Sequence, residues 1–285
     1  MAVDFVFLDS GTGGIPYMLH LLKKSPDSKC VYVGDTANFP YGNKTHEEVV
    51  KCVIDVVGKI IQRFNPKVIV LACNTMSVNA LDVVRSIYPD NTFVGTVPAI
   101  KLASETSKNR RIGLMATKST IEHPYNQDLK NHFASDCELV LQPAPDLISF
   151  IEHEAFTASK EECIKAIEPS VEFFRKNNCD CIILGCTHFL NLADLIQEVA
   201  GEKIKVVDSV EGVVNRALSV IGALRGVPAE GVAEKTAGCA EDFGAQGKAF
   251  PSFNTLYVTG FTDKKDENEY NVICKRFNLS FGGKL

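Results

Sequence analysis

Short apolar runs alternate with stretches of helical periodicity along most of this chain. The apolar runs end at small or polar residues, and we expect each of them to be a buried β-strand. The predicted strands are residues 3–8, 30–33, 67–72, 112–115, 182–185, 204–207 and 255–258. Helices are predicted at residues 13–24, from Thr45 to the stop at Asn65-Pro66, around 81–87, and at 160–177, 211–224 and 267–277. Alternating strands and helices predict an α/β fold with open, mostly parallel sheets.

Local signals add detail to two of these predictions and give a third one. Thr45 and Glu48 have the spacing of a capping box, so we expect the helix to begin there. Pro169 lies inside the predicted helix 160–177, where we expect a kink or a break. Residues 225–251 are rich in Gly and Ala and lack periodicity, which predicts a loop or a weak helix.

Two segments of the chain mirror each other, and each carries a cysteine at a strand end. Residues 68–75 read VIVLACNT and residues 181–188 read CIILGCTH. A polar strand end precedes each cysteine by a similar distance, since Asp9 lies 64 residues before Cys73 and Thr117 lies 69 residues before Cys186. This spacing predicts an internal duplication: two similar α/β domains that face each other across a cleft.

Composition narrows the class of protein. The 285 residues are 45% hydrophobic and 23% charged with a net charge of −5, which is typical of a soluble enzyme of one or two domains. No Lys/Arg cluster indicates a nucleic-acid partner. No signal peptide or membrane-spanning run is apparent, so we expect no membrane partner and a cytoplasmic location. Cys52, Cys163 and Cys274 lie in apolar runs and are expected to be reduced core residues.

Cys73 and Cys186 are the strongest candidates for chemistry. Ligands of open α/β sheets bind beyond the carboxyl ends of the strands, where both thiols are expected to lie. A lone cysteine at such a position is more often a packed core residue, but here the position recurs. The predicted helix N-terminus after each cysteine would lower the thiol pKa toward neutrality. Two facing thiols can remove a proton from one side of a carbon and return one to the other, which is racemase chemistry.

Other sites compete with this interpretation. Cys179, Cys181, Cys186 and His188 are dense enough to suggest zinc. A strand from 181 to 186 would separate its ends by about 16 Å, however, so no metal site is expected. The turn at residues 9–14 lacks the spacing of a nucleotide-binding loop, and it is either a plain tight turn or a place where Asp9 and Ser10 face the cleft. His188 could assist proton transfer at Cys186, whereas Glu152 has little support from the residues alone.

The motifs together resemble the glutamate racemases of the aspartate/glutamate racemase superfamily. The carriers are FLDSGTGG at 7–14, GDTANFPYG at 34–42, ACNT at 72–75 and GCTH at 185–188, with Asp208-Ser209 and Thr259-Gly260 also in agreement. The resemblance implies interconversion of L- and D-glutamate without a cofactor, supplying D-glutamate for peptidoglycan. It also implies a second domain inserted into the first, hence residues 1–97 plus 208–285 and residues 98–207, and a homodimer.

The resemblance assigns roles residue by residue. It makes Cys73 and Cys186 the acid/base pair, with Asp9 assisting near Cys73 and with His188 and Glu152 assisting near Cys186. The residues that it implies for substrate binding are Asp9, Ser10, Tyr41, Gly42, Asn74, Thr75, Thr187 and His188. Two rival functions stay open: a racemase for aspartate or another amino acid, and a non-catalytic amino-acid-binding protein with inert cysteines.

Overall fold

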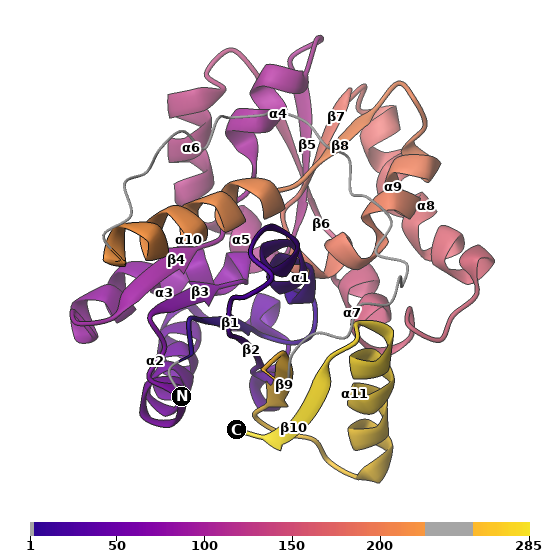
Figure 1. Cartoon of the computed structure of the whole chain (residues 1–285). Helices are drawn as coiled ribbons and strands as arrows, with labels where there is room; N and C mark the ends of the chain where they lie inside the picture. The colour runs from indigo at the N-terminus through magenta and orange to yellow at the C-terminus, as the bar shows by residue number, and fades with distance from the viewer. Residues whose placement is uncertain (1–2, 226–252) are drawn as a thin grey trace.

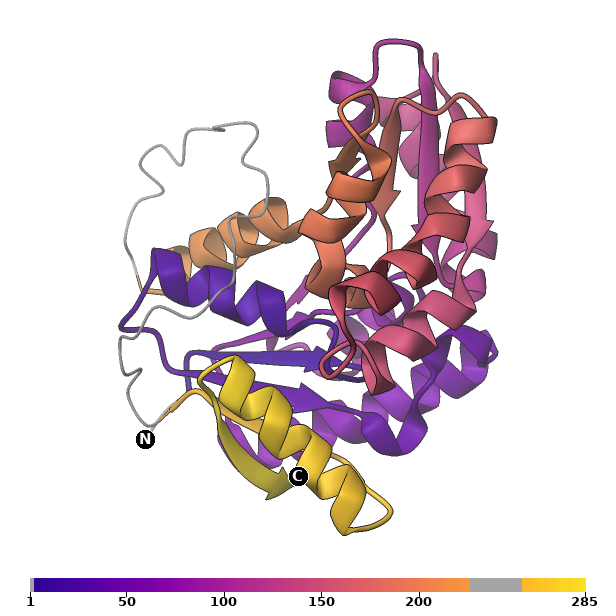
Figure 2. The same cartoon turned by 90° about the vertical axis from the view of Figure 1, so that its right-hand side faces the viewer.

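The computed structural model describes residues 3–225 and 253–285, which form two parallel β-sheets with their helices (Figure 1). The loop or weak helix expected at 225–251 lies, except for its first residue, outside the described residues. In Figure 2 the six-stranded sheet occupies the lower half of the molecule and the four-stranded sheet the upper half. The predicted α/β class with two open sheets is therefore confirmed.

The six-stranded sheet has the strand order β10-β9-β2-β1-β3-β4. Its members are β1 (Phe5–Asp9), β2 (Cys30–Gly34), β3 (Val68–Leu71), β4 (Thr92–Gly95), β9 (Thr255–Val258) and β10 (Ser280–Lys284). Every described pair of neighbours runs parallel. Because the strands are parallel, their carboxyl ends, including Asp9 and the residues after Leu71, meet at one edge.

The four-stranded sheet repeats the central order of the larger one. Its order is β6-β5-β7-β8, with β5 (Arg111–Ala116), β6 (Glu138–Pro143), β7 (Cys181–Leu184) and β8 (Lys205–Val207). The strands that end before Cys73 and before Cys186 are the third strand of each set and pair with the first strand, β1 or β5. The small sheet thus has the same strand order as the central four strands of the large one, β2-β1-β3-β4, as the internal duplication predicts.

Eleven α-helices of the described chain connect and cover the strands. They are α1 (Ile15–Lys24), α2 (His46–Phe64), α3 (Asn74–Ile87), α4 (Ile100–Thr106), α5 (Lys118–Glu122), α6 (Tyr125–Phe133), α7 (Pro145–His153), α8 (Lys160–Lys176), α9 (Ala193–Ala200), α10 (Val210–Leu224) and α11 (Lys264–Arg276). Three 3₁₀ turns are η1 (Thr36–Asn38), η2 (Tyr41–Asn43) and η3 (Thr187–Leu192). The capping box of Thr45 and Glu48 is present at the start of α2.

Side-chain alternation along β1 determines how the large sheet is covered. Phe5 and Phe7 pack into a core with α1 and α10, whereas Val6 and Leu8 face a second core with α2 and α3. The first of these cores continues into the small sheet and its helices. One apolar core therefore joins the two sheets and fixes their relative position.

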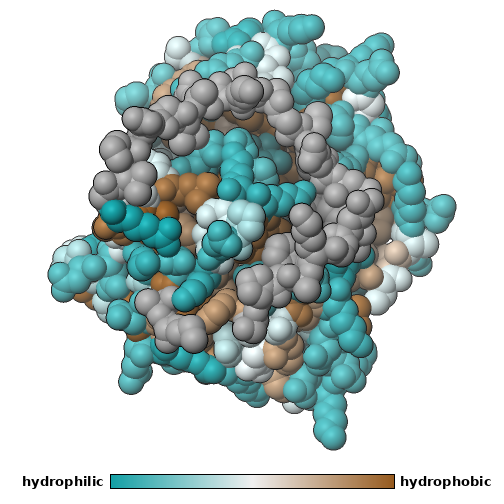
Figure 3. All heavy atoms as spheres, in the orientation of Figure 1, coloured by the Kyte–Doolittle hydropathy of each residue, from teal (hydrophilic) through white to brown (hydrophobic). Residues whose placement is uncertain are grey.

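Several elements differ from the predictions. Helix α8 continues through Pro169, so a break there is wrong. Eight of the described β-strands and α-helices have no counterpart among the predicted strands and helices: β4, β6, β10, α4, α5, α6, α7 and α9. No helix in the described ranges is long and apolar enough to cross a membrane, and the outer parts of the face in Figure 3 are mostly hydrophilic.

Candidate active site

A cavity of about 1160 Å³ opens between the two sheets and contains both candidate thiols. Cys73 lies just beyond β3 of the large sheet and Cys186 just beyond β7 of the small one. The predicted site residues that line the cavity are Ser10, Tyr41, Gly42, Cys73, Asn74, Thr75, Cys186 and His188. The structure thus brings residues of four separate sequence motifs to one place.

Cys73 is the N-cap residue of α3 and is 5% exposed. Its sulfur lies 3.9 Å from the Ser10 hydroxyl and accepts from the backbone N–H of Met76. Burial, and then the neighbouring Asp9 carboxylate, raise the pKa of the Cys73 thiol well above its usual value despite that N–H. The expectation that the helix N-terminus lowers the pKa of this thiol is therefore wrong, because desolvation outweighs the helix.

Asp9 lies behind Cys73 and does not line the cavity. It is fully buried at the end of β1. One of its oxygens accepts from the Gly14 N–H at 2.7 Å and from the hydroxyls of Tyr32 and Thr187 at 3.2 Å each, and the other accepts from the Ser10 N–H at 2.7 Å. Burial nevertheless raises the pKa of Asp9. Asp9 therefore lies where it can influence Cys73 and Ser10, and it is not part of the surface that a substrate in the cavity would contact.

Cys186 has a different environment, built on an imidazole. Its Sγ lies 3.6 Å from Nδ1 of His188, whose Nε2 lies 2.9 Å from the Glu152 carboxylate. Burial alone would lower the pKa of His188, but the hydrogen bond and charge of Cys186 and the Glu152 carboxylate raise it well above 6.5. Burial likewise opposes ionisation of Glu152, yet bonds from His188 and Thr12 lower its pKa. The arrangement favours a Glu152–His188 ion pair beside the Cys186 sulfur.

The element after Cys186 differs from the prediction. Cys186 precedes the 3₁₀ turn η3, and the α-helix begins only at Ala193. Residues after the two cysteines therefore present their backbones differently. The two sulfurs also differ in their side-chain neighbours. Cys73 lies near a carboxylate and a hydroxyl group, and Cys186 lies beside an imidazole.

Glycines in the turn after β1 make room for the imidazole and its partner. A Cβ on Gly11 would lie 2.5 Å from the Glu152 carboxylate, and one on Gly13 would lie 2.6 Å from the His188 backbone nitrogen. Thr12, between them, donates its hydroxyl to Glu152 at 2.7 Å. The turn is tight because groups of the small sheet pack directly against it, and its Ser10 also lines the cavity.

The remaining predicted residues have distinct surroundings. Both amide atoms of Asn74 are buried without a hydrogen-bond partner among the described residues, although the side chain lines the cavity. Thr75 bonds to the Thr117 hydroxyl at 2.9 Å. Thr187 is engaged with Asp9 and does not line the cavity. Asn74 is therefore a polar group free to bind a ligand, whereas Thr187 joins the two sheets.

Sequence reasoning missed part of the cavity lining. Thr117 served only to mark the repeat, yet it lines the cavity, and a Cβ on Gly42 would lie 2.9 Å from its Cβ. The C-terminal segment from Gly260 to Tyr270 also contributes to the wall. The Thr259-Gly260 motif was a signal for that segment, but the sequence does not show that it reaches this cavity.

The other cysteines that the structure describes do not line the cavity. Cys163 and Cys274 are buried as expected, whereas Cys52 is partly exposed. Cys181 begins β7 and Cys186 follows its end, as the geometric argument against zinc requires. Within residues 3–225 and 253–285, no group of three or more His, Cys, Asp or Glu side chains is arranged to hold a metal ion.

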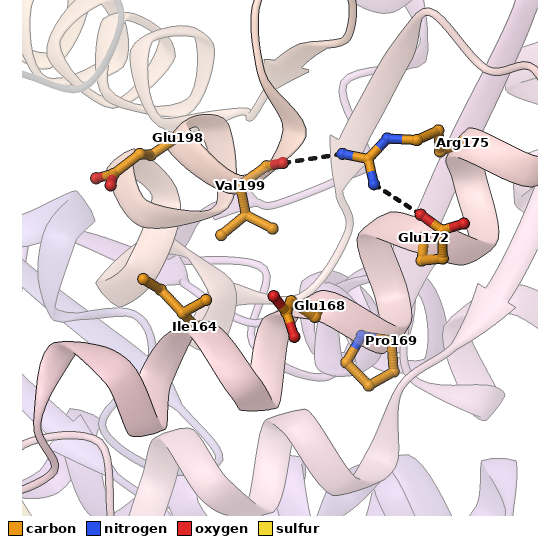
Figure 4. A pocket seen from close by; sticks show the side chains of 7 residues that line it. All are labelled: Ile164, Glu168, Pro169, Glu172, Arg175, Glu198 and Val199. Carbon is orange, nitrogen blue, oxygen red and sulfur yellow. Dashed lines mark hydrogen bonds and ion pairs between the residues drawn. The ribbon is translucent and has the colours of Figure 1, made fainter.

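A second hollow lies on the surface between α8 and α9 (Figure 4). Three glutamates line it, and Arg175 bonds there to Glu172 and to the Val199 carbonyl. None of its described lining residues is a nucleophile or a histidine. The cavity between the sheets is therefore the candidate active site.

The chain is similar to several known proteins of one family. Residues 17–217 match the family model for Asp/Glu/Hydantoin racemase. A glutamate racemase of Treponema pallidum (strain Nichols) is 35% identical over 99% of this chain and 96% of the relative, and one of Brucella suis biovar 1 is 33% identical over 75% and 78%. The Escherichia coli glutamate racemase in complex with L-glutamate and the activator UDP-MurNAc-ala superposes with a TM-score of 0.79 at 25% identity, covering 99% of this chain and 98% of that one.

The family match spans more than half of the chain, and the Treponema relative spans nearly all of it. A Francisella tularensis glutamate racemase in complex with D-glutamate has the same fold, with a TM-score of 0.73, 21% identity and coverage of 99% and 96%. The chain belongs to the Asp/Glu/Hydantoin racemase family and is an amino-acid racemase.

Proposed function

We propose that this racemase interconverts L- and D-glutamate by a two-base proton transfer between Cys73 and Cys186, without a cofactor. The observation that carries the proposal is that the two thiols enter one cavity from corresponding strand ends of two sheets with the same order. A substrate between the sheets would present opposite faces of its α-carbon to the two sulfurs. One thiolate removes the α-proton, and the opposite thiol donates a proton to the other face.

The surroundings of the sulfurs support this assignment. The Glu152–His188 pair places an imidazole beside the Cys186 sulfur, where it can assist proton transfer, whereas burial and the Asp9 carboxylate raise the pKa of Cys73. The α-proton is weakly acidic, so the base acts best in a dry, preorganised cleft. One cysteine must begin as thiolate and the other as thiol. By the resemblance, Cys186 removes the proton of L-glutamate and Cys73 that of D-glutamate, so the roles reverse with the opposite enantiomer.

Relatives and polar groups together favour glutamate as the substrate. The similar proteins are named glutamate racemases. The unpartnered Asn74 amide can both donate to a carboxylate and accept from an ammonium, and Ser10, Thr75 and Gly42 lie around the same space. We extend the proposal to domains at 1–97 plus 208–285 and 98–207, a cytoplasmic homodimer, and a role in supplying D-glutamate for peptidoglycan.

Solvent-deuterium exchange tests the proposed function directly. In D₂O, NMR should show loss of the α-proton signal of L-glutamate, and polarimetry should show that D-glutamate forms. L-aspartate and L-glutamine should exchange much more slowly. Preferred exchange of aspartate would identify an aspartate racemase. Bound glutamate without exchange would identify a binding protein. Activity that is abolished by EDTA dialysis and restored by a metal would contradict the cofactor-free mechanism.

A further inference from the structure

The loop that carries Tyr41 and Gly42 is held by a strand from the far end of the chain. This binding loop, residues 35–43, follows β2, and β9 pairs with β2 alongside it. The Thr259 hydroxyl donates to the Asp35 carboxylate at 2.6 Å and accepts from the Ala37 N–H at 3.0 Å. One side chain after β9 therefore bonds both a buried charge and the backbone of the loop.

A second pair of bonds next to Thr259 completes the attachment. The Thr36 hydroxyl donates to the Gly260 carbonyl at 2.5 Å and accepts from the Gly260 N–H at 3.2 Å. A Cβ on Gly260 would lie 3.0 Å from the Ala37 Cβ, so the small residue permits the close approach. The loop is thus joined to the end of β9 at two successive residues.

Asp35 transmits this attachment to the substrate side of the loop. Its carboxylate is fully buried and accepts from the Tyr41 hydroxyl and from the Asn38 amide at 3.0 Å. Tyr41 and Gly42 line the cavity, so the Tyr41 ring is aimed by Asp35 while its hydroxyl is occupied. Removing a donor from a buried carboxylate leaves it less satisfied, which loosens every group that it holds.

We propose that Thr259 is a positioning residue of the substrate site, which fixes the binding loop through Asp35 and Ala37. The proposal rests on the proposed function, because it concerns the site where glutamate binds. Thr259 does not contact the substrate. Its effect is on how well the loop is preorganised, so its loss should weaken binding more than it slows the chemical step.

Thr259→Val tests the proposal, because valine keeps the branched shape and removes the hydroxyl. We expect KM for L-glutamate to rise on the order of tenfold, with a smaller fall in kcat, since a hydrogen bond to a charged group is lost. Thr259→Ser should restore KM to near that of the parent protein. Thr255→Val, at the opposite end of β9, is the matched control and should leave both constants unchanged. Thr36→Val should move KM in the same direction as Thr259→Val.

Hydrogen exchange gives a readout that needs no turnover. The Ala37 amide should lose protection in Thr259→Val and keep it in Thr259→Ser and Thr255→Val. If the parent protein racemises glutamate and Thr259→Val has an unchanged KM, or if the serine variant is as impaired as the valine variant, the positioning role is wrong while the proposed function stands. If the parent protein does not racemise glutamate, the proposed function fails, and unchanged Ala37 protection in Thr259→Val and Thr36→Val would overturn the attachment as well.

Discussion

At the scale of single residues, the two thiols of the cavity are not equivalent. Cys73 has Ser10 and Asp9 beside it, whereas Cys186 has the imidazole of His188 backed by Glu152. The Asp9 carboxylate helps to raise the pKa of the Cys73 thiol, whereas the Cys186 sulfur has an imidazole as its neighbour. A symmetric reaction is therefore assigned to an asymmetric pair of groups, and each can be tested by itself.

Single replacements of the cysteines should separate the two proton transfers. Ser raises the pKa of the acid/base group far above working pH, so Cys73→Ser and Cys186→Ser should each nearly abolish racemisation. An analogue with a leaving group on the β-carbon needs only the first deprotonation. Cys73→Ser should still eliminate from the L-analogue and Cys186→Ser from the D-analogue, as product release in a spectrophotometric assay would show. If both variants eliminated from both the L- and the D-analogue, the two cysteines would not be bases on opposite faces of the α-carbon.

Removal of the Glu152 charge should reveal the ion pair in the pH dependence of stability. A histidine with a raised folded pKa contributes stability that is complete below its unfolded pKa near 6.5 and is lost as pH rises through the folded value. We therefore expect Glu152→Gln to lower the free energy of unfolding by about 3 kcal/mol near pH 6, and by progressively less as pH rises through the raised folded pKa of His188. Urea unfolding measures this, with the exposed Glu154→Gln as control. A loss of unfolding free energy that grows with rising pH would contradict the Glu152–His188 ion pair.

Among the helices and strands, those with a clear local sequence pattern were predictable from the sequence. The cysteine strands and the start of α2 follow from apolar runs and from the Thr45–Glu48 cap, and the structure confirms them. Edge strand β6 was missed because its residues are mostly half-buried or exposed, and β10 because it contains two glycines. In these strands, pairing with a neighbour outweighs weak local preference.

The candidate site was predictable to the same extent. Residues next to a strand end, such as Ser10 and Asn74, line the cavity, and their place in the motifs made them candidates. The raised pKa of Cys73 was not predictable, because it depends on burial and on Asp9, 64 residues earlier in the chain. The wall formed after β9 was missed for the same reason, since its position depends on pairing between β2 and β9.

The capping box of α2 has a measurable share in stability. Thr45 accepts from the Glu48 N–H at 3.3 Å, and Glu48 accepts from the Thr45 N–H at 2.8 Å. Thr45→Ala should lower the free energy of unfolding by about 1 kcal/mol, because an N-terminal N–H loses its acceptor. Thr45→Ser keeps the acceptor and should cost much less in the same urea titration. Equal losses in the two variants would show that the cap bond is not the cause.

At the scale of the whole molecule, bonds between the sheets assemble the site. Thr12 of the large sheet's first turn binds Glu152, Thr187 binds Asp9, and Thr75 binds Thr117. Each carboxylate that supports one sulfur is thus held in part by a donor from the other half of the chain. The halves position each other's candidate catalytic groups.

Alkylation should map this assembled cavity. Glutamate should protect Cys73 and Cys186 from iodoacetamide, because both line the cavity, and should leave labelling of the partly exposed Cys52 unchanged. Peptide mass spectrometry with and without substrate measures the three rates in one sample. Protection of Cys179 or Cys181 to a similar degree would place the substrate elsewhere.

The strand order also has a consequence for how the chain is made. The four-stranded sheet takes all its strands from a continuous stretch, Arg111 to Val207, whereas the six-stranded sheet combines β1–β4 with β9 and β10. During synthesis on the ribosome, all four strands of the sheet next to Cys186 are translated earlier than β9. The half that carries Cys73 must wait for β9 and β10, and with them for Thr259. A nascent chain therefore exposes an unfinished sheet edge at β2 until β9 has been translated.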